Sequence, residues 1–86
     1  MKLIRWNLLN NERLKAERGV SFDEVIRGRL IAIKVHPKKS HQSIMLFDFK
    51  GYIWVVPFVR TNGELFLKTL YPSRKYTSMY RKGGLT

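Results

Sequence analysis

Three basic residues near the end of the chain have the types and spacing that phosphodiester chemistry needs. Lys68 is soon followed by Ser73-Arg74-Lys75, and no acidic residue follows Glu64. A planar guanidinium can bind two phosphate oxygens at once, and grouped cations stabilise the negative charge that a phosphorane gains. The sequence therefore predicts a catalytic site around Lys68, Arg74 and Lys75, with Arg74 as the first choice for the scissile phosphate. The alternative is a solvated basic rim.

Both histidines lie in the segment His36-Pro37-Lys38-Lys39-Ser40-His41-Gln42, which its proline and charges predict to be a loop. Histidine is the side chain that changes charge near neutral pH, so His36 is a candidate general acid or base. A solvated loop histidine is the competing interpretation. Lys38, Lys39 and His41 are candidate RNA contacts, because the loop adds a second cationic surface.

Four more residues are candidate RNA contacts: Arg60, Tyr71, Tyr80 and Arg81. Tyrosine rings can stack on bases, although for Tyr71 packing against Trp54 is the favoured interpretation. The sequence has no glycine-rich phosphate loop and no Ser-His-Asp set. Two loop histidines without an acidic third ligand are a poor metal signal, so we expect neither a metal nor a cofactor.

The charge balance points to an anionic partner. The 86 residues carry 17 Lys or Arg against six Asp or Glu, a formal net charge of +11. Hydrophobic residues make up 44% and aromatic residues 13%, which predicts one folded domain over residues 1–86 instead of a disordered tail. Attraction to nucleic acid is the favoured interpretation, and an acidic protein partner is the alternative.

The absence of cysteine excludes disulfides and thiolate metal sites. No apolar run approaches the roughly 18 residues of a membrane span. The start, MKLIRWNLLNN, is too short and polar for a signal peptide. We therefore expect a cytoplasmic protein without membrane contact.

The stretch from Ile44 to Tyr76 reads as three consecutive strands. Lys50-Gly51 and Asn62-Gly63 sit between β-forming runs, and glycine suits the positive φ of two-residue hairpins. The resulting register places three pairs opposite each other: Phe47 with Trp54, Phe58 with Leu67, and Trp54 with Tyr71. Pro57 cannot donate to a ladder, so it predicts a bulge or an unpaired position in the middle strand.

Strand side chains alternate between faces, so this register also predicts which residues share a face. We assign the more aromatic face to the helix-covered core: Met45, Phe47, Phe49, Trp54, Val56, Phe58, Leu65 and Leu67. The more open face then holds Ile44, Leu46, Ile53, Val55, Val59, Phe66 and Leu70, with Asp48 and Lys68.

The first half of the chain predicts two helices. Trp6–Arg18 has Asn7 as a plausible N-cap, Gly19 beyond its end, and a packing stripe of Leu9, Leu14 and Ala16. A capping box at Ser21-Phe22-Asp23-Glu24 predicts a second helix over Phe22–Arg27, ended by Gly28.

The remaining segments complete an α+β domain. Leu30–Val35 reads as a further strand, Lys2–Arg5 as a short edge strand, and Ser73–Arg81 as a short C-terminal helix. The predicted architecture is two N-terminal helices packed on a four-stranded antiparallel sheet, followed by that helix.

Two segments resemble one known family. Trp6–Val25, WNLLNNERLKAERGVSFDEV, is similar to the opening of BrnT-family toxins, which have the RelE-like ribonuclease fold. Arg74-Lys75-Tyr76-Thr77 resembles the Arg-Lys-Ala-Thr segment of that family, with Tyr76 in place of the small residue. Together they cover about a third of the chain. The tail after Thr77 is shorter than in typical members.

The resemblance implies a ribonuclease toxin that cuts RNA, either free or on the ribosome, and inhibits translation. It also implies a cognate antitoxin of the ribbon-helix-helix type, through which the pair binds operator DNA. Two other functions are compatible with the residues. One is a non-catalytic basic module that binds nucleic acid or the ribosome, and the other is an inactive toxin that acts as a co-repressor.

Overall fold

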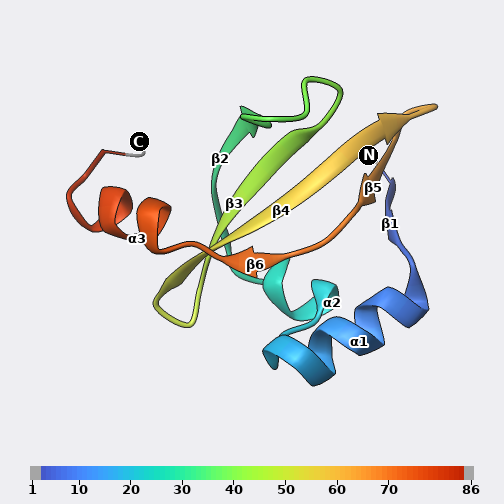
Figure 1. The fold of residues 1–86 in the computed structure, drawn as a ribbon, viewed down its shortest axis with the longest axis horizontal. Coiled ribbons are helices and arrows are strands. Elements are labelled where there is room, and N and C mark those ends of the chain that lie inside the picture. Colours follow the sequence, from blue (N-terminus) through green and yellow to red (C-terminus); the bar gives the residue numbers. More distant parts are fainter. Residues whose placement is uncertain (1–2, 85–86) are drawn as a thin grey trace.

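A computed structural model describes residues 3–84 of the protein (Figure 1). In chain order, the elements are β1 (Leu3–Trp6), α1 (Leu8–Arg18), α2 (Phe22–Val25), β2 (Arg29–Val35), β3 (Ser43–Phe49), β4 (Tyr52–Thr61), β5 (Glu64–Leu67), β6 (Tyr71–Pro72) and α3 (Arg74–Arg81). No helix within residues 3–84 is long and apolar enough to cross a membrane.

The strands form one mixed sheet in the order β1-β5-β4-β3-β2, and β6 pairs with the other half of β4. The N-terminal strand β1 lies at one edge and runs parallel to β5. The α+β class, the edge strand and the three helices are confirmed. The expectation of four antiparallel strands is wrong, because β1 and β6 join the sheet and β1 is parallel. Lys2, part of the expected edge strand, lies outside the described residues.

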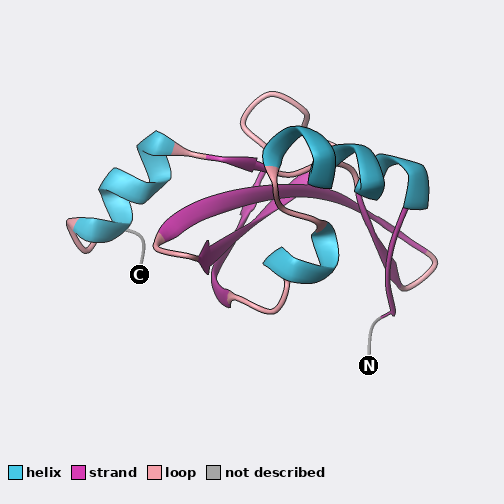
Figure 2. Cartoon of the chain, turned by 90° about the horizontal axis from the view of Figure 1, so that it is seen from below, coloured by secondary structure: helices cyan, strands magenta, loops and turns pink. Residues whose placement is uncertain are grey.

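The helices lie on different sides of the sheet. Figure 2 shows α1 and α2 together over one face, while α3 lies at the far end of the molecule. The core between α1, α2 and the sheet contains the aromatic face that the alternation predicted, including Phe47, Trp54 and Phe58. The opposite face is less open than expected, because Tyr76, Met79 and Tyr80 of α3 pack against its apolar residues Ile44, Leu46, Ile53 and Val55.

Both hairpin turns are confirmed. Lys50 and Gly51 have φ values of 54° and 77°, and Asn62 and Gly63 have 50° and 79°. These paired left-handed conformations match the twist of the flanking strands and fix the register by loop length. Phe47 accordingly pairs with Trp54, and Phe58 pairs with Leu67.

The register changes at Pro57. The Lys68 N–H donates to the Pro57 carbonyl at 2.8 Å, but Pro57 has no N–H to return the bond. The Lys68 carbonyl instead accepts from the Asn10 side-chain amide at 3.0 Å, and the ladder stops there. The expected interruption at Pro57 is thereby confirmed.

Pairing resumes one residue out of step. Val55 pairs with Tyr71 and Trp54 with Pro72, so the predicted pairing of Trp54 with Tyr71 is wrong. Because one extra residue flips the faces, Leu70 is fully buried in the core under α1 and α2, not on the opposite face. Tyr71 moves to the opposite face instead.

The caps of α1 are confirmed: Asn7 accepts from the Asn10 N–H at 2.9 Å, and Gly19 has φ 76°. The helix begins at Leu8, because Trp6 belongs to β1. The predicted apolar stripe is wrong, since only Leu14 is buried while Leu9 and Ala16 are exposed. Asparagines fasten this helix, and Asn11 Oδ1 accepts from the N–H of Phe22 at 2.7 Å.

The capping box of α2 is present, with the Ser21 N–H donating to Glu24 Oε1 at 3.0 Å. The helix ends at Val25 instead of Arg27. Strand β2 and the loop over residues 36–42 occur where the sequence predicts them.

Candidate nucleic-acid interface

The helix α3 carries cations at an end where they do not help the helix. Ser73 caps it by accepting from the Tyr76 N–H at 3.0 Å. The first turn contains Arg74 and Lys75 and no acidic residue. The N-terminal end of a helix carries partial positive charge, so basic residues there are mildly unfavourable. Stability of the helix therefore does not explain these two residues.

A buried threonine holds the first turn of α3 against the sheet. Thr77 is 3% exposed, and its Oγ1 donates to the Ser73 carbonyl at 2.6 Å and accepts from the Ile53 N–H at 2.9 Å. The Ser73 N–H in turn donates to the Ile53 carbonyl at 2.9 Å. These bonds fix where Arg74 leaves the sheet.

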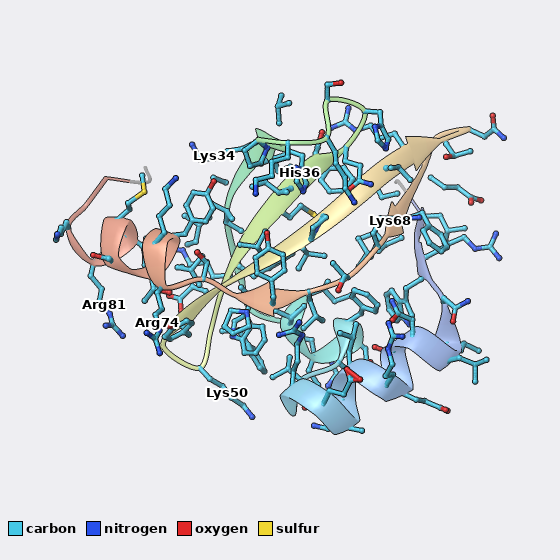
Figure 3. All side chains as sticks on the ribbon, viewed as in Figure 1. Lys34, His36, Lys50, Lys68, Arg74 and Arg81 are labelled. Atoms are coloured by element: carbon cyan, nitrogen blue, oxygen red, sulfur yellow. The ribbon has the colours of Figure 1, made fainter. Side chains whose placement is uncertain are left out.

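The last turn of α3 is tied to the β3–β4 hairpin. Arg81 Nη2 donates to the Gly51 carbonyl at 3.2 Å, which leaves other N–H groups of this guanidinium free to bind an anion. Figure 3 shows Arg74, Arg81 and Lys50 at this end of the molecule. Arg74 and Arg81, both predicted site residues, are thus brought together.

Between these two arginines lies an open pocket of about 330 Å³, which we call the α3 pocket. It is lined by Tyr52, Arg74, Thr77, Ser78, Arg81 and Lys82. None of the six is acidic. The Thr77 hydroxyl is already used by Ser73 and Ile53, but three cations and the hydroxyl groups of Tyr52 and Ser78 remain around the hollow. Together they form a surface suited to a phosphate.

Few carboxylates balance the charge on this side. Within residues 3–84 there are two ion pairs, Arg5 with Glu64 at 3.5 Å and Lys15 with Glu24 at 2.8 Å. Neither involves α3. The segment 65–86 contains five basic residues and no acidic one, whereas residues 8–28 contain four of each. The cations around α3 are therefore largely uncompensated.

Lys68 does not join this group, and the expectation of one cluster of Lys68, Arg74 and Lys75 is wrong. Lys68 lies level with Pro57 on β4, whereas Ser73 lies level with Ile53. Four residues of extended strand separate these levels by about 13 Å. The Lys68 ammonium lies over the ring of Phe66, 5.5 Å from its centroid. Figure 3 shows Lys68 well away from Arg74.

Lys75 follows Arg74 but is not among the residues that line the α3 pocket. Its ammonium lies 5.7 Å from the ring centroid of Tyr76. It is exposed and adds positive charge beside the pocket.

His36 organises its own loop. Its Nδ1 accepts from the backbone N–H groups of Lys38 and Lys39 at 3.0 and 3.1 Å. In the neutral ring the hydrogen is consequently on Nε2, and this nitrogen acts as a hydrogen-bond donor and not as an acceptor. The loop precedes β3 and the Gly51 turn follows it, so His36 and Arg81 lie at opposite ends of that strand. The candidate general acid or base is therefore not beside the α3 pocket.

The other predicted RNA contacts are dispersed. Lys38, Lys39 and His41 are exposed in the same loop, and Arg60 lies near the Asn62 turn with its guanidinium 5.9 Å from the Phe58 ring centroid. Tyr80 is part of α3 and packs against the apolar residues of the sheet beneath this helix.

Tyr71 lies on the open part of the face that α3 partly covers and is 36% exposed. Burial, and to a smaller extent Tyr76, raises the pKa of its hydroxyl, which therefore stays protonated at neutral pH. Tyr71 can present both a ring and a donor to a nucleotide.

Four lining residues of the α3 pocket were not predicted as site residues: Tyr52, Thr77, Ser78 and Lys82. Thr77 stood in the segment that resembles the Arg-Lys-Ala-Thr motif, and Lys82 adjoins Arg81, so these two had a signal in the sequence. Tyr52 reaches the pocket only through the β3–β4 hairpin, which no local pattern connects with α3.

Comparison with known proteins identifies a shared fold. No protein-family model and no curated protein matches the sequence. Among solved structures, the crystal structure of the Brucella abortus ribonuclease toxin BrnT is similar, with a TM-score of 0.58. The two sequences are 18% identical, and the match covers 85% of this chain and 97% of that one. The resemblance found in the sequence is confirmed at the level of structure: the chain has a BrnT-like fold.

Proposed function

We propose that the protein is a ribonuclease toxin that cuts RNA at the α3 pocket and thereby inhibits translation. One observation carries the proposal: uncompensated Arg74, Arg81 and Lys82 surround an open pocket on a BrnT-like fold. Arg74 is the proposed ligand of the scissile phosphate, because its side chain is the first to leave the fixed first turn of α3.

In the proposed reaction the RNA supplies its own nucleophile. The 2′-oxygen attacks phosphorus, the bond to the 5′-oxygen breaks, and a 2′,3′-cyclic phosphate and a 5′-hydroxyl are formed. The 2′-hydroxyl proton passes to water. The leaving oxygen takes a proton from the Tyr52 hydroxyl, chosen because it lines the α3 pocket with Arg74 and Arg81, and Tyr52 regains the proton from solvent. The three cations stabilise the phosphorane, which is often the largest contribution to catalysis.

Cleavage is proposed to need no metal ion, because cations of the protein fill the stabilising role. The test is digestion of a fluorescently labelled RNA by the purified protein in the presence of EDTA, with identification of the product ends. Cyclic phosphate ends that persist in EDTA support the proposal. Cleavage abolished by EDTA and restored by magnesium contradicts it.

The matched pair of variants is Arg74→Ala and Arg18→Ala. Arg18 is an exposed arginine at the end of α1, in the segment whose charges balance. We expect Arg74→Ala to slow cleavage by about a hundredfold or more and Arg18→Ala to leave it nearly unchanged. Equal effects of the two substitutions would show that only the overall charge matters.

Partners follow from the same proposal. An antitoxin of the ribbon-helix-helix type would neutralise the toxin and carry the pair to operator DNA, and the RNA would be cut in the cytoplasm, free or on the ribosome. Coexpression with the product of a neighbouring reading frame tests this part. Rescue of growth and a purified complex would support it, and unrelieved growth arrest would contradict it.

The second candidate is a non-catalytic module that binds nucleic acid or the ribosome. The position of His36 favours it, because the loop histidine lies at the opposite end of β3 from Arg81. Under this alternative, Arg74→Ala weakens RNA binding and makes its salt dependence shallower, while the wild type cuts nothing.

A further inference from the structure

A second hollow lies between the first two turns of α1 and the end of β5. It has a volume of about 590 Å³, and we call it the α1 hollow. It is lined by Asn7, Leu9, Asn10, Arg13, Phe66 and Lys68. Its back is held by the bond from the Asn10 amide to the Lys68 carbonyl, which Pro57 leaves free. The hollow is therefore a fixed part of the fold.

At the start of α1 the leucines face solvent, whereas the asparagines that follow them bind the rest of the fold. Leu8 and Leu9 are 74% and 77% exposed at the start of α1. Asn10 and Asn11 make the contacts that fasten the helix. Leu9 lines the hollow and Leu8 precedes Leu9 in the chain. Exposed leucines next to a hollow form the kind of apolar surface that a protein partner covers.

Cations frame the apolar surface. Lys68 places its ammonium over the Phe66 ring, and Arg13 is held by a hydrogen bond from Nη2 to Asn10 Oδ1 at 2.6 Å. Neither cation belongs to the two ion pairs found within residues 3–84. Both are oriented and available to carboxylates that approach from outside.

We propose that the α1 hollow binds an acidic, leucine-bearing segment of a partner protein. An apolar side chain of that segment packs between Leu9 and Phe66, and its carboxylates pair with Arg13 and Lys68. Charge complementarity selects this occupant, because a second copy of a chain with net charge +11 would repel the first. Exposed leucines offer little to a phosphate backbone, which disfavours RNA.

This inference deepens the antitoxin part of the proposed function, since it names the chemistry of the partner and its docking surface. It does not depend on RNA cleavage. The function of Lys68 is thereby moved from catalysis to partner binding, in agreement with its separation from Arg74 (Figure 3).

The test selects peptides from a random phage-displayed library on the immobilised full-length protein. We expect enrichment of sequences that combine Asp or Glu with Leu, Ile, Met or Phe. One enriched peptide is then synthesised with a fluorophore, and its affinity is measured by anisotropy. Leu9→Ser and the double variant Arg13→Glu, Lys68→Glu should each weaken it by about tenfold or more.

Two variants serve as controls. Leu30→Ser removes an equally apolar, 47% exposed side chain on β2. The double variant Arg18→Glu, Arg27→Glu makes the same charge change at two exposed arginines outside the hollow. Both should bind the peptide like the wild type apart from a small general effect of charge. Leu9 is largely exposed, so Leu9→Ser is expected to fold, and circular dichroism verifies this.

Three results would overturn the proposal: no enrichment of acidic apolar peptides, equal binding by wild type and Leu9→Ser, or displacement of the peptide by oligouridylate. Displacement by oligouridylate is measured on Arg74→Ala, so that RNA at the α3 pocket does not interfere. Displacement would assign the α1 hollow to RNA. Peptide affinity and RNA cleavage are separate readouts, so failure of one proposal is distinguishable from failure of the other.

Discussion

The α1 hollow and the α3 pocket are both basic, but they differ in what surrounds the cations. In the α1 hollow, Arg13 and Lys68 accompany Leu9 and Phe66. In the α3 pocket, three cations accompany hydroxyl groups only. A cation beside an apolar surface suits a protein segment, whereas a cation beside hydroxyls suits a phosphate. Net charge alone therefore does not identify a partner, and the neighbours of each cation do.

The segment with α1 and α2 and the segment with α3 also differ in their balance of acidic and basic residues. Residues 8–28 hold four acidic and four basic residues, and Lys15 pairs with Glu24 there. The segment 65–86 has five basic residues and no acidic one. In the first segment carboxylates neutralise the basic residues, whereas in the second the positive charge can bind an anion from outside. Cleavage rates, salt dependence and sensitivity to acid should therefore differ between the two regions.

The largest effect is expected from removing both arginines of the α3 pocket. Arg74→Ala with Arg81→Ala should slow RNA cleavage by about a thousandfold, because two charge-assisted contacts to the phosphorane are lost. The matched double variant is Arg18→Ala with Arg27→Ala, in the balanced region. Single-turnover cleavage rates measure both, and a similar loss in the two double variants would remove the distinction between the regions.

A smaller effect is expected at the tether of α3. Thr77→Val keeps the volume but removes the acceptor of the buried Ile53 N–H, which should lower the free energy of unfolding by about 1 to 3 kcal/mol. Thr77→Ser retains the hydroxyl and should lose less. Urea unfolding followed by fluorescence checks the order, and equal stability of wild type and Thr77→Val would mean that the bond does not hold α3.

Salt dependence should report single cations. For a non-cleavable RNA, Lys82→Ala should reduce the slope of log affinity against log salt by about 0.7, the value for one contact to single-stranded nucleic acid. Lys15→Ala should not change it, because Lys15 is already paired with Glu24. A slope that falls equally in both variants would contradict the assignment of RNA to the α3 side.

Acid should weaken the balanced region first. The Lys15 ammonium, followed by the Ser21 N–H and hydroxyl, lowers the pKa of Glu24 from 4.5 to about 2. A lowered pKa stabilises the fold above pH 4.5, and this contribution is lost as the pH falls from 4.5 towards 2. The stability of the Glu24→Gln variant should therefore depend less on pH between 4.5 and about 2 than that of the wild type.

Amide hydrogen exchange provides the measurement, because it follows α2 and α3 separately. Exchange in α2 should accelerate over this pH range relative to α3, which has no carboxylate to titrate. Parallel acceleration in both helices, or an unchanged pH profile in Glu24→Gln, would speak against the role of Glu24.

Local features of the fold were predictable because they depend on near neighbours. Gly51 and Gly63 fix the hairpins, and Asn7 and Ser21 start their helices with bonds to residues three positions away. The parallel pairing of β1 with β5 joins residues about sixty positions apart, and no local pattern encodes it.

The candidate site was predicted in part for the same reason. Arg74 and Arg81 are two turns apart on one helix, so helical spacing brings them together. Lys68 was misplaced because Pro57 interrupts the ladder and an extra residue shifts the register beyond it. Leu9 was misplaced because Asn10 and Asn11, not leucines, fasten α1.

The most direct test of the account measures RNA cleavage and peptide binding on the same two variants, Arg74→Ala and Leu9→Ser. We predict that Arg74→Ala loses cleavage by about a hundredfold and keeps the peptide affinity, while Leu9→Ser keeps cleavage and loses the affinity by about tenfold. A variant that loses both activities while still folded would contradict the assignment of the two hollows to different classes of macromolecule.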